Sequence, residues 1–110
     1  LKNSMGVLGG NRGSLHHNLG QSLADLATVI RPKLTVVDAT RILLRNGPQG
    51  GNVDDVRRTD TLIASADPVA ADAYATTLFE LEPGDIEATV AAFELGLGEM
   101  DLARIKVVAA

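Results

Sequence analysis

The segment from Ala64 to Ala73 constrains the fold most, because it contains a helix start directly after a strand-like run. Asp67 is a favourable N-cap residue, and Pro68 takes the first helical position, where proline is preferred. The preceding residues Thr61-Leu62-Ile63-Ala64 are β-branched or aliphatic and are predicted to form a strand. This part of the chain therefore predicts a strand, a tight turn and a helix in direct succession.

Two further helices are predicted from apolar residues spaced three and four apart. Ser14 is the expected N-cap of the first, which must stop before Pro32. The second begins around Pro83-Gly84-Asp85, and Gly96 and Gly98 suit its C-terminal end. We expect both apolar stripes to face a sheet: Leu15, Leu19, Leu23, Leu26 and Ile30 in the first, and Ile86, Val90, Phe93 and Leu97 in the second.

Three strands are predicted, at residues 34–39, 61–64 and 105–108. The interval between the first two holds the turn-rich loop Arg45–Asn52 and no helical pattern, which favours antiparallel or loop-mediated pairing over a standard crossover. The order of elements indicates an α/β layered sandwich, in which helices flank a mixed sheet of about three or more strands. At 110 residues, this is one domain spanning residues 1–110.

Charge and composition narrow the classes of partner. The net charge of −4 argues against nucleic-acid binding, which depends on clustered Lys and Arg. The absence of cysteine excludes disulfides and cysteine-ligated metal clusters within these residues. No apolar run is long enough to span a bilayer and no signal-peptide pattern is present within these residues. We expect a cytoplasmic location, with a signal sequence in the parent as the alternative. Because the chain opens inside a motif, we expect it to be a piece of a longer parent protein.

Three aspartates are candidate ligand-binding residues, each with a structural alternative. Asp67 can serve as a helix cap alone or also contact a ligand at the rim of a site. Asp72 is either a solvated helical residue or an inward-facing carboxylate. Asp38 ends a predicted strand, where ligands gather in open α/β sheets, although it can also cap a turn.

The N-terminal residues suggest an anion or metal site. The loop Gly9–Gly13 runs into a helix start, where backbone N–H groups favour a small anion, and Lys2 and Arg12 lie nearby in sequence; the alternative is a simple connecting loop. His16 and His17 fall in the first helical turn. Their side chains diverge by about 100°, so only one of them can readily bind a given ion, and surface histidines are commoner.

Several different short motifs are distributed along the chain: Lys2-Asn3-Ser4-Met5-Gly6, His16-His17, Ala24-Asp25-Leu26, Val36-Val37-Asp38-Ala39, Gly47-Pro48, the segment from Ala64 to Asp72, Gly96-Leu97-Gly98 and Asp101-Leu102. In this combination and order the chain resembles DUF362, a family of unassigned function found in bacteria and archaea. The resemblance implies the C-terminal half of the family domain. It also implies a redox setting, since members often carry iron–sulfur segments; such a cluster lies elsewhere in the parent or is absent.

A fainter similarity is to the lactate racemase family with its nickel pincer cofactor. There a lysine before a glycine-rich loop holds the cofactor and a later histidine binds nickel, and Lys2 and His16 or His17 have comparable spacing. Three hypotheses follow: a DUF362-type domain lending a ligand, cofactor or metal site to a redox-associated parent, an isomerase or racemase using a metal or pincer cofactor, and a structural or docking domain. The residues expected at the site are Lys2, Asn3, Arg12, Asp38, Asp67, Asp72 and one of His16 and His17.

Overall fold

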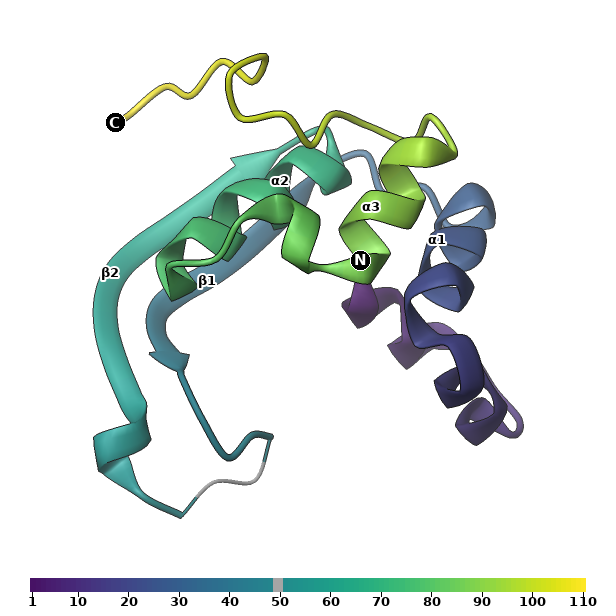
Figure 1. Cartoon of the computed structure of the whole chain (residues 1–110), viewed down its shortest axis with the longest axis horizontal. Coiled ribbons are helices and arrows are strands. Elements are labelled where there is room, and N and C mark those ends of the chain that lie inside the picture. The colour runs from purple at the N-terminus through teal and green to yellow at the C-terminus, as the bar shows by residue number, and fades with distance from the viewer. Residues whose placement is uncertain (49–50) are drawn as a thin grey trace.

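The computed structural model describes residues 1–48 and 51–110 and arranges the main elements in a row (Figure 1). A two-stranded sheet lies at one side, helix α2 (Pro68–Thr76) packs on it, and α3 (Glu87–Glu94) follows. Helix α1 (Leu19–Val29) lies at the far side of α3. Short 3-10 helices join these elements: η1 (Lys2–Val7), η2 (Arg12–Asn18), η3 (Val53–Asp55), η4 (Thr77–Phe79) and η5 (Pro83–Asp85).

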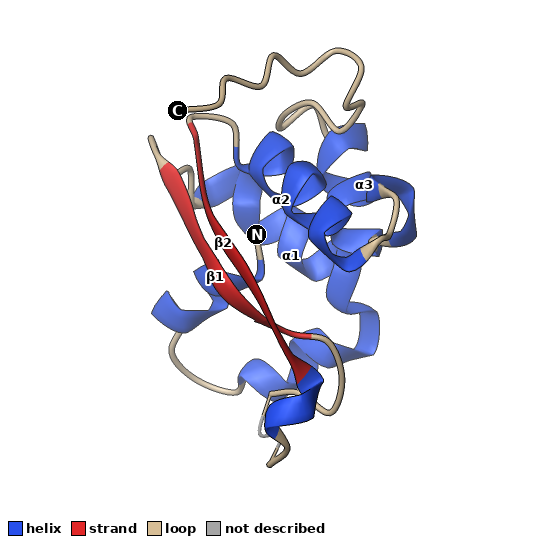
Figure 2. Cartoon of the chain, turned by 90° about the vertical axis from the view of Figure 1, so that its left-hand side faces the viewer, coloured by secondary structure: helices blue, strands red, loops and turns tan. Residues whose placement is uncertain are grey.

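The sheet consists of β1 (Thr35–Leu43) and β2 (Val56–Ser65), paired antiparallel from Thr35 opposite Ser65 to Leu43 opposite Val56 (Figure 2). The expected antiparallel pairing is confirmed, and both strands are longer than predicted. The expected third strand is not formed, because residues 105–108 lie beside β2 without strand pairing. Within the described ranges the protein is therefore an α/β domain with two strands and not a sandwich around a larger mixed sheet.

Asp55 holds together the turn that joins the two strands. Its buried carboxylate accepts hydrogen bonds from Arg45 Nε at 3.1 Å and Asn46 Nδ2 at 2.8 Å. Its carbonyl accepts from the Leu44 N–H at 2.7 Å. These bonds fix the loop predicted at Arg45–Asn52 to the start of β2, although residues 49–50 of that loop lie outside the described part of the chain. The hairpin thus needs no crossover helix.

The first helix begins differently from the prediction. The residues after Asn11 form η2 before α1 starts at Leu19, and the cap is Asn11, whose side chain accepts from the Gly13 N–H at 3.2 Å. Ser14 instead donates from Oγ to the Asn11 carbonyl at 3.0 Å, so its expected role as N-cap is wrong. The helix ends at Val29, ahead of the proline, as predicted.

Helices α1 and α3 pack against each other, and α2 covers the sheet. A Cβ added at Gly20 would lie 2.6 Å from Glu87 Cβ, so the two backbones cross too closely for any side chain there. The expectation that both apolar stripes face the sheet is therefore wrong. The buried residues at this crossing are small ones, and the central cluster comprises Ala24, Val69, Ala91 and Ala92, with Leu1, Leu97 and Met100 packed against it.

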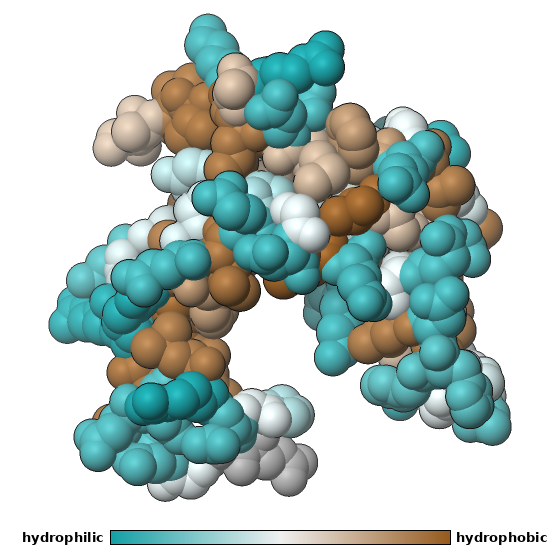
Figure 3. Space-filling view, in the orientation of Figure 1, coloured by the Kyte–Doolittle hydropathy of each residue, from teal (hydrophilic) through white to brown (hydrophobic). Residues whose placement is uncertain are grey.

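The elements give the molecule an open, arched shape. The hairpin end and the N-terminal helices form two arms, and the face in Figure 3 is hollowed between them. The outward face of the sheet exposes Val36 and Leu62. No helix in the described ranges is long and apolar enough to cross a membrane.

Candidate functional site

The residue before the Lys2–Gly6 motif contacts Asp72, which belongs to the second distinctive motif of the sequence. The Leu1 nitrogen donates a hydrogen bond to Asp72 Oδ2 at 2.7 Å, and the Leu1 side chain is only 2% exposed. This contact joins the residue before the Lys2–Gly6 motif to the middle of α2. Lys2 and Asn3 follow in η1 with exposed side chains. Lys2 and Asn3 are thus next in sequence to the residue that binds Asp72, while η1 itself packs against α1.

A cavity of about 310 Å³ lies beside Asp72. Its walls come from the C-terminal half of α2 and the residues around η5 and α3. Most of them are apolar, and the polar groups are the Asp72 carboxylate and two threonines. The lining residues are Asp72, Ala75, Thr76, Phe79, Leu81, Ile86 and Thr89.

The two threonines of this cavity differ in how their hydroxyls are satisfied. Thr76 Oγ1 donates to the Asp72 backbone carbonyl at 2.8 Å. Thr89 is fully buried, and its Oγ1 has no hydrogen-bond partner among the described residues. A buried hydroxyl without a partner costs free energy, so a bound group that pairs with it gains that hydrogen bond at little cost. Sequence reasoning missed both residues; their one signal is a polar side chain inside an otherwise small and apolar helix face.

Both carboxylate oxygens of Asp67 accept hydrogen bonds from backbone N–H groups. Oδ1 accepts from the N–H groups of Val69 at 2.8 Å and Ala70 at 3.0 Å, which confirms the predicted N-cap of α2. Oδ2 accepts from the Glu99 N–H at 2.8 Å. We call this pair of interactions the Asp67 latch. A Cβ at Gly98 would lie 2.0 Å from Asp67 Oδ1, so glycine is required where the C-terminal segment passes.

Asp38 lies away from this cavity, on the exposed outward face of the sheet. It stands opposite Leu62 in the strand register. The Thr40 backbone N–H donates to Asp38 Oδ1 at 2.9 Å and the Thr40 hydroxyl at 2.8 Å. These bonds, with the nearby Arg41 charge, hold the pKa of the Asp38 carboxyl below its usual value. The contacts of Asp38 are therefore local ones, as expected if it caps a turn.

The remaining predicted residues lie on η2 and the loop before it. His16 and His17 are both exposed, and Arg12 Nη1 contacts the Met5 carbonyl at 3.4 Å, which links η2 to η1. Across residues 1–48 and 51–110, no three His, Cys, Asp or Glu side chains gather closely enough to hold a metal ion. The metal role of either histidine stays a prediction that needs ligands from outside this group.

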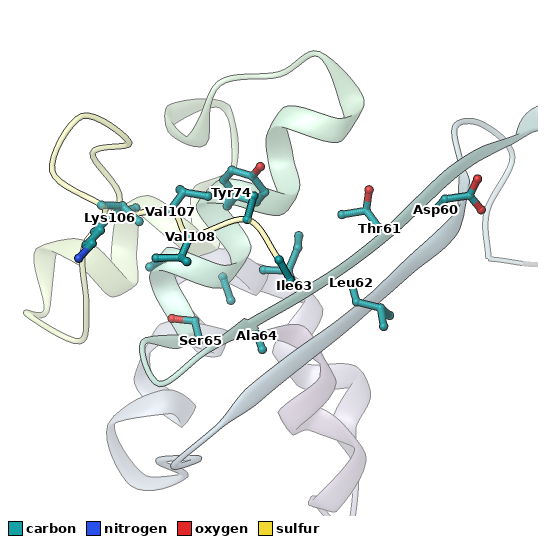
Figure 4. A pocket seen from close by; sticks show the side chains of 15 residues that line it. Asp60, Thr61, Leu62, Ile63, Ala64, Ser65, Tyr74, Lys106, Val107 and Val108 are labelled. Carbon is teal, nitrogen blue, oxygen red and sulfur yellow. The ribbon is translucent and has the colours of Figure 1, made fainter.

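A second and larger cavity, of about 740 Å³, lies between β2, α2 and the C-terminal residues 105–110 (Figure 4). Tyr74 from α2 and Val107 and Val108 from the C-terminal segment border it, with Ile63 on the side of the sheet. None of the site residues predicted from the sequence lines this cavity. This cavity and the one beside Asp72 are therefore separate and lie on different sides of α2.

Comparison with known proteins identifies the family. The family model described as a domain of unknown function, DUF362, matches residues 1–77. The chain belongs to the DUF362 family. No curated protein matches the chain, and no solved structure does. The nickel pincer similarity therefore gains no support from known relatives.

The DUF362 match covers both the Lys2–Gly6 motif and the segment that contains Asp72. The Lys2–Gly6 motif lies at its start and the segment from Ala64 to Asp72 lies near its end. The hydrogen bond between Leu1 and Asp72 therefore joins opposite ends of the matched region. Asp67 also lies in this region, whereas its partner Glu99 lies beyond it.

Proposed function

We propose that this DUF362 domain binds a small organic ligand in the cavity beside Asp72 and lends that site to a longer, redox-associated parent protein. The observation that carries the proposal is the combination of a carboxylate and an unpaired buried hydroxyl on one mostly apolar cavity. Ligand sites are concave, largely apolar and supplied with a few convergent polar groups. The volume of about 310 Å³ suits a small metabolite-sized molecule.

The polar groups define the class of ligand. The Asp72 carboxylate offers acceptor oxygens, and its side chain is 28% exposed, so a donor on the ligand can reach it. Thr89 Oγ1 can donate or accept. The expected ligand therefore has an apolar body that contacts Phe79 and Ile86 and an N–H or ammonium group that binds Asp72. Lys2 and Asn3, exposed on η1, are expected at the entrance, where Lys2 can pair with an anionic group of the same ligand.

The redox setting rests on the family resemblance. This chain offers no cysteine for an iron–sulfur cluster, so a cluster would be held by other parts of the parent. An anion at the Gly9–Gly13 loop, with Arg12, and a metal on His16 or His17 are further expectations for the assembled parent. The pincer-type isomerase hypothesis requires Lys2 and one histidine at the same reacting centre, and a nickel analysis of the parent protein tests it separately.

The proposal is tested on the full-length protein by native mass spectrometry, which detects bound small molecules and metals. Wild type is expected to retain a ligand, and Asp72→Asn and Thr89→Val to lose it, while the control Asp25→Asn retains it. Asp25 is an exposed α1 residue that contacts Gln21 at 2.9 Å and lies outside the cavity. Wild-type protein that carries no ligand, or an Asp72→Asn variant with unchanged ligand content, would leave the structural or docking hypothesis as the better description.

A further inference from the structure

One edge of strand β2 is unpaired. β2 pairs with β1 along one side, and no described residue pairs with its other side. Two-stranded sheets are only marginally stable in water, and an unpaired edge invites association with other chains. Native proteins cover such edges with another strand, a loop or a helix. We therefore expect a segment of chain to pair with this free edge of β2, which borders a cavity of about 740 Å³.

The chain itself supplies a segment suited to this edge. Residues Ile105-Lys106-Val107-Val108 are rich in β-branched side chains, which favour strands. They line the cavity directly across from residues 60–65 of β2. In Figure 4 the labelled residues of β2 and of the C-terminal segment run in opposite directions, which is the orientation of antiparallel pairing.

The C-terminal segment is anchored at its start, and beyond Arg104 it makes no hydrogen bond or ion pair with the described residues. The Asp67 latch fixes Glu99, and the Arg104 N–H donates to the Asp101 carbonyl at 2.9 Å. Val107 and Val108 are 54% and 78% exposed, although both are aliphatic. Asp67, which binds Glu99, lies two residues after the end of β2, so the segment begins near the C-terminal end of that strand.

We propose that residues 105–108 act as a strap that closes the larger cavity by pairing antiparallel with the free edge of β2. The closed state has a three-stranded sheet with the order β1, β2, strap. It covers Ile63 and Tyr74 and replaces the cavity with backbone hydrogen bonds. The open state is the one described above, in which the cavity is accessible. This proposal is independent of the ligand site, which lies on the other side of α2.

Engineered cysteine pairs test the closed state in the full-length protein. Peptide mapping separates their disulfides from any formed by cysteines elsewhere in the parent, since this chain contributes no thiol of its own. Ala64→Cys is combined with Val107→Cys or with Val108→Cys, and mild oxidation is followed by peptide mapping. At least one pair is expected to form a disulfide, since neighbouring strands bring Cα atoms within bonding range. The control places the cysteine at Val36, which lies opposite Ala64 on β1 and is shielded from the strap by β2. Equal cross-linking to Val36 and Ala64, or none to Ala64, overturns the proposal.

Amide hydrogen exchange gives a second, cysteine-free measurement. The Val107→Pro variant cannot make the strap pairing, because proline lacks the N–H and disrupts strand backbone. It is expected to lose protection at the β2 amides that point away from β1, while the Val107→Thr control, which keeps a β-branched side chain, retains it. Protection at these amides that is the same in both variants shows that another element covers the edge and refutes the strap.

Discussion

The Asp67 latch makes separable contributions to stability, and two substitutions at one position can divide them. Asparagine caps helices as well as aspartate does, so Asp67→Asn preserves the bonds to Val69 and Ala70. Its amide nitrogen faces the Glu99 N–H in place of Oδ2, so one donor meets another and a hydrogen bond to a charged group is lost. Such bonds contribute roughly 1.5–3 kcal/mol, so we expect Asp67→Asn to lower the free energy of unfolding by about 2 kcal/mol.

Asp67→Ala removes the helix cap as well. Losing an N-cap costs about 1 kcal/mol, so the total loss is expected to reach roughly 3 kcal/mol. Urea unfolding followed by circular dichroism measures both values, with Asp25→Asn on the exposed face of α1 as the control, expected within about 0.5 kcal/mol of wild type. An Asp67→Asn variant as stable as that control would show that the Glu99 bond contributes nothing and that Asp67 is a cap alone. Equal losses for the two Asp67 variants would instead show that the cap contributes nothing.

Three further predictions concern the core and the hairpin. Gly20→Ala should destabilise by about 1–3 kcal/mol through its clash with Glu87, whereas Gly84→Ala, with no atom within 4 Å of the new Cβ, should not, and thermal unfolding compares them. Leu23→Ala empties a buried site on α1 and should cost roughly 2–5 kcal/mol in urea unfolding; a loss below about 0.5 kcal/mol would contradict its burial. Hydrogen bonds from Asn46 and Arg45 lower the pKa of Asp55, so its stabilisation is complete above the ordinary aspartate pKa and is lost as the pH falls through the lowered value, below about pH 4. Acid titration should therefore unfold wild type with a steeper pH dependence than Asp55→Asn, and equal slopes would exclude this linkage.

Local signals in the sequence were sufficient for several elements. The succession of strand, cap and helix around Asp67 was predicted because a cap and an N1 proline act within a few residues. The antiparallel pairing followed from a loop without helical periodicity. The packing of α1 on α3 did not follow, because it depends on the close approach of Gly20 to Glu87, which no single-segment pattern reveals. The prediction of a third strand was wrong because strand formation also depends on a paired neighbour. Ile105–Val108 has strand-forming residues but no paired neighbour among the described residues.

In the candidate site too, local contacts could be predicted from the sequence, whereas contacts between distant segments could not. The sequence left the orientation of Asp72 open, because its nearest donor, Leu1, lies 71 positions away along the chain. The hydroxyl of Thr89 carried no signal, since its lack of a partner is a property of the packed helices and not of the residues beside it. Asp38 followed the local alternative, with both of its donors on Thr40 two residues later.

The separation between Leu1 and Asp72 sets an order of folding. The two residues stand 71 positions apart, whereas the Asp67 latch spans only 32. Loop closure costs more entropy as the separation grows, so contacts between distant residues form after local ones. During synthesis η1 leaves the ribosome before α1 and α2, and it can pack against α1 before α2 is made. The contact between Leu1 and Asp72 is therefore completed late, once α2 has been made.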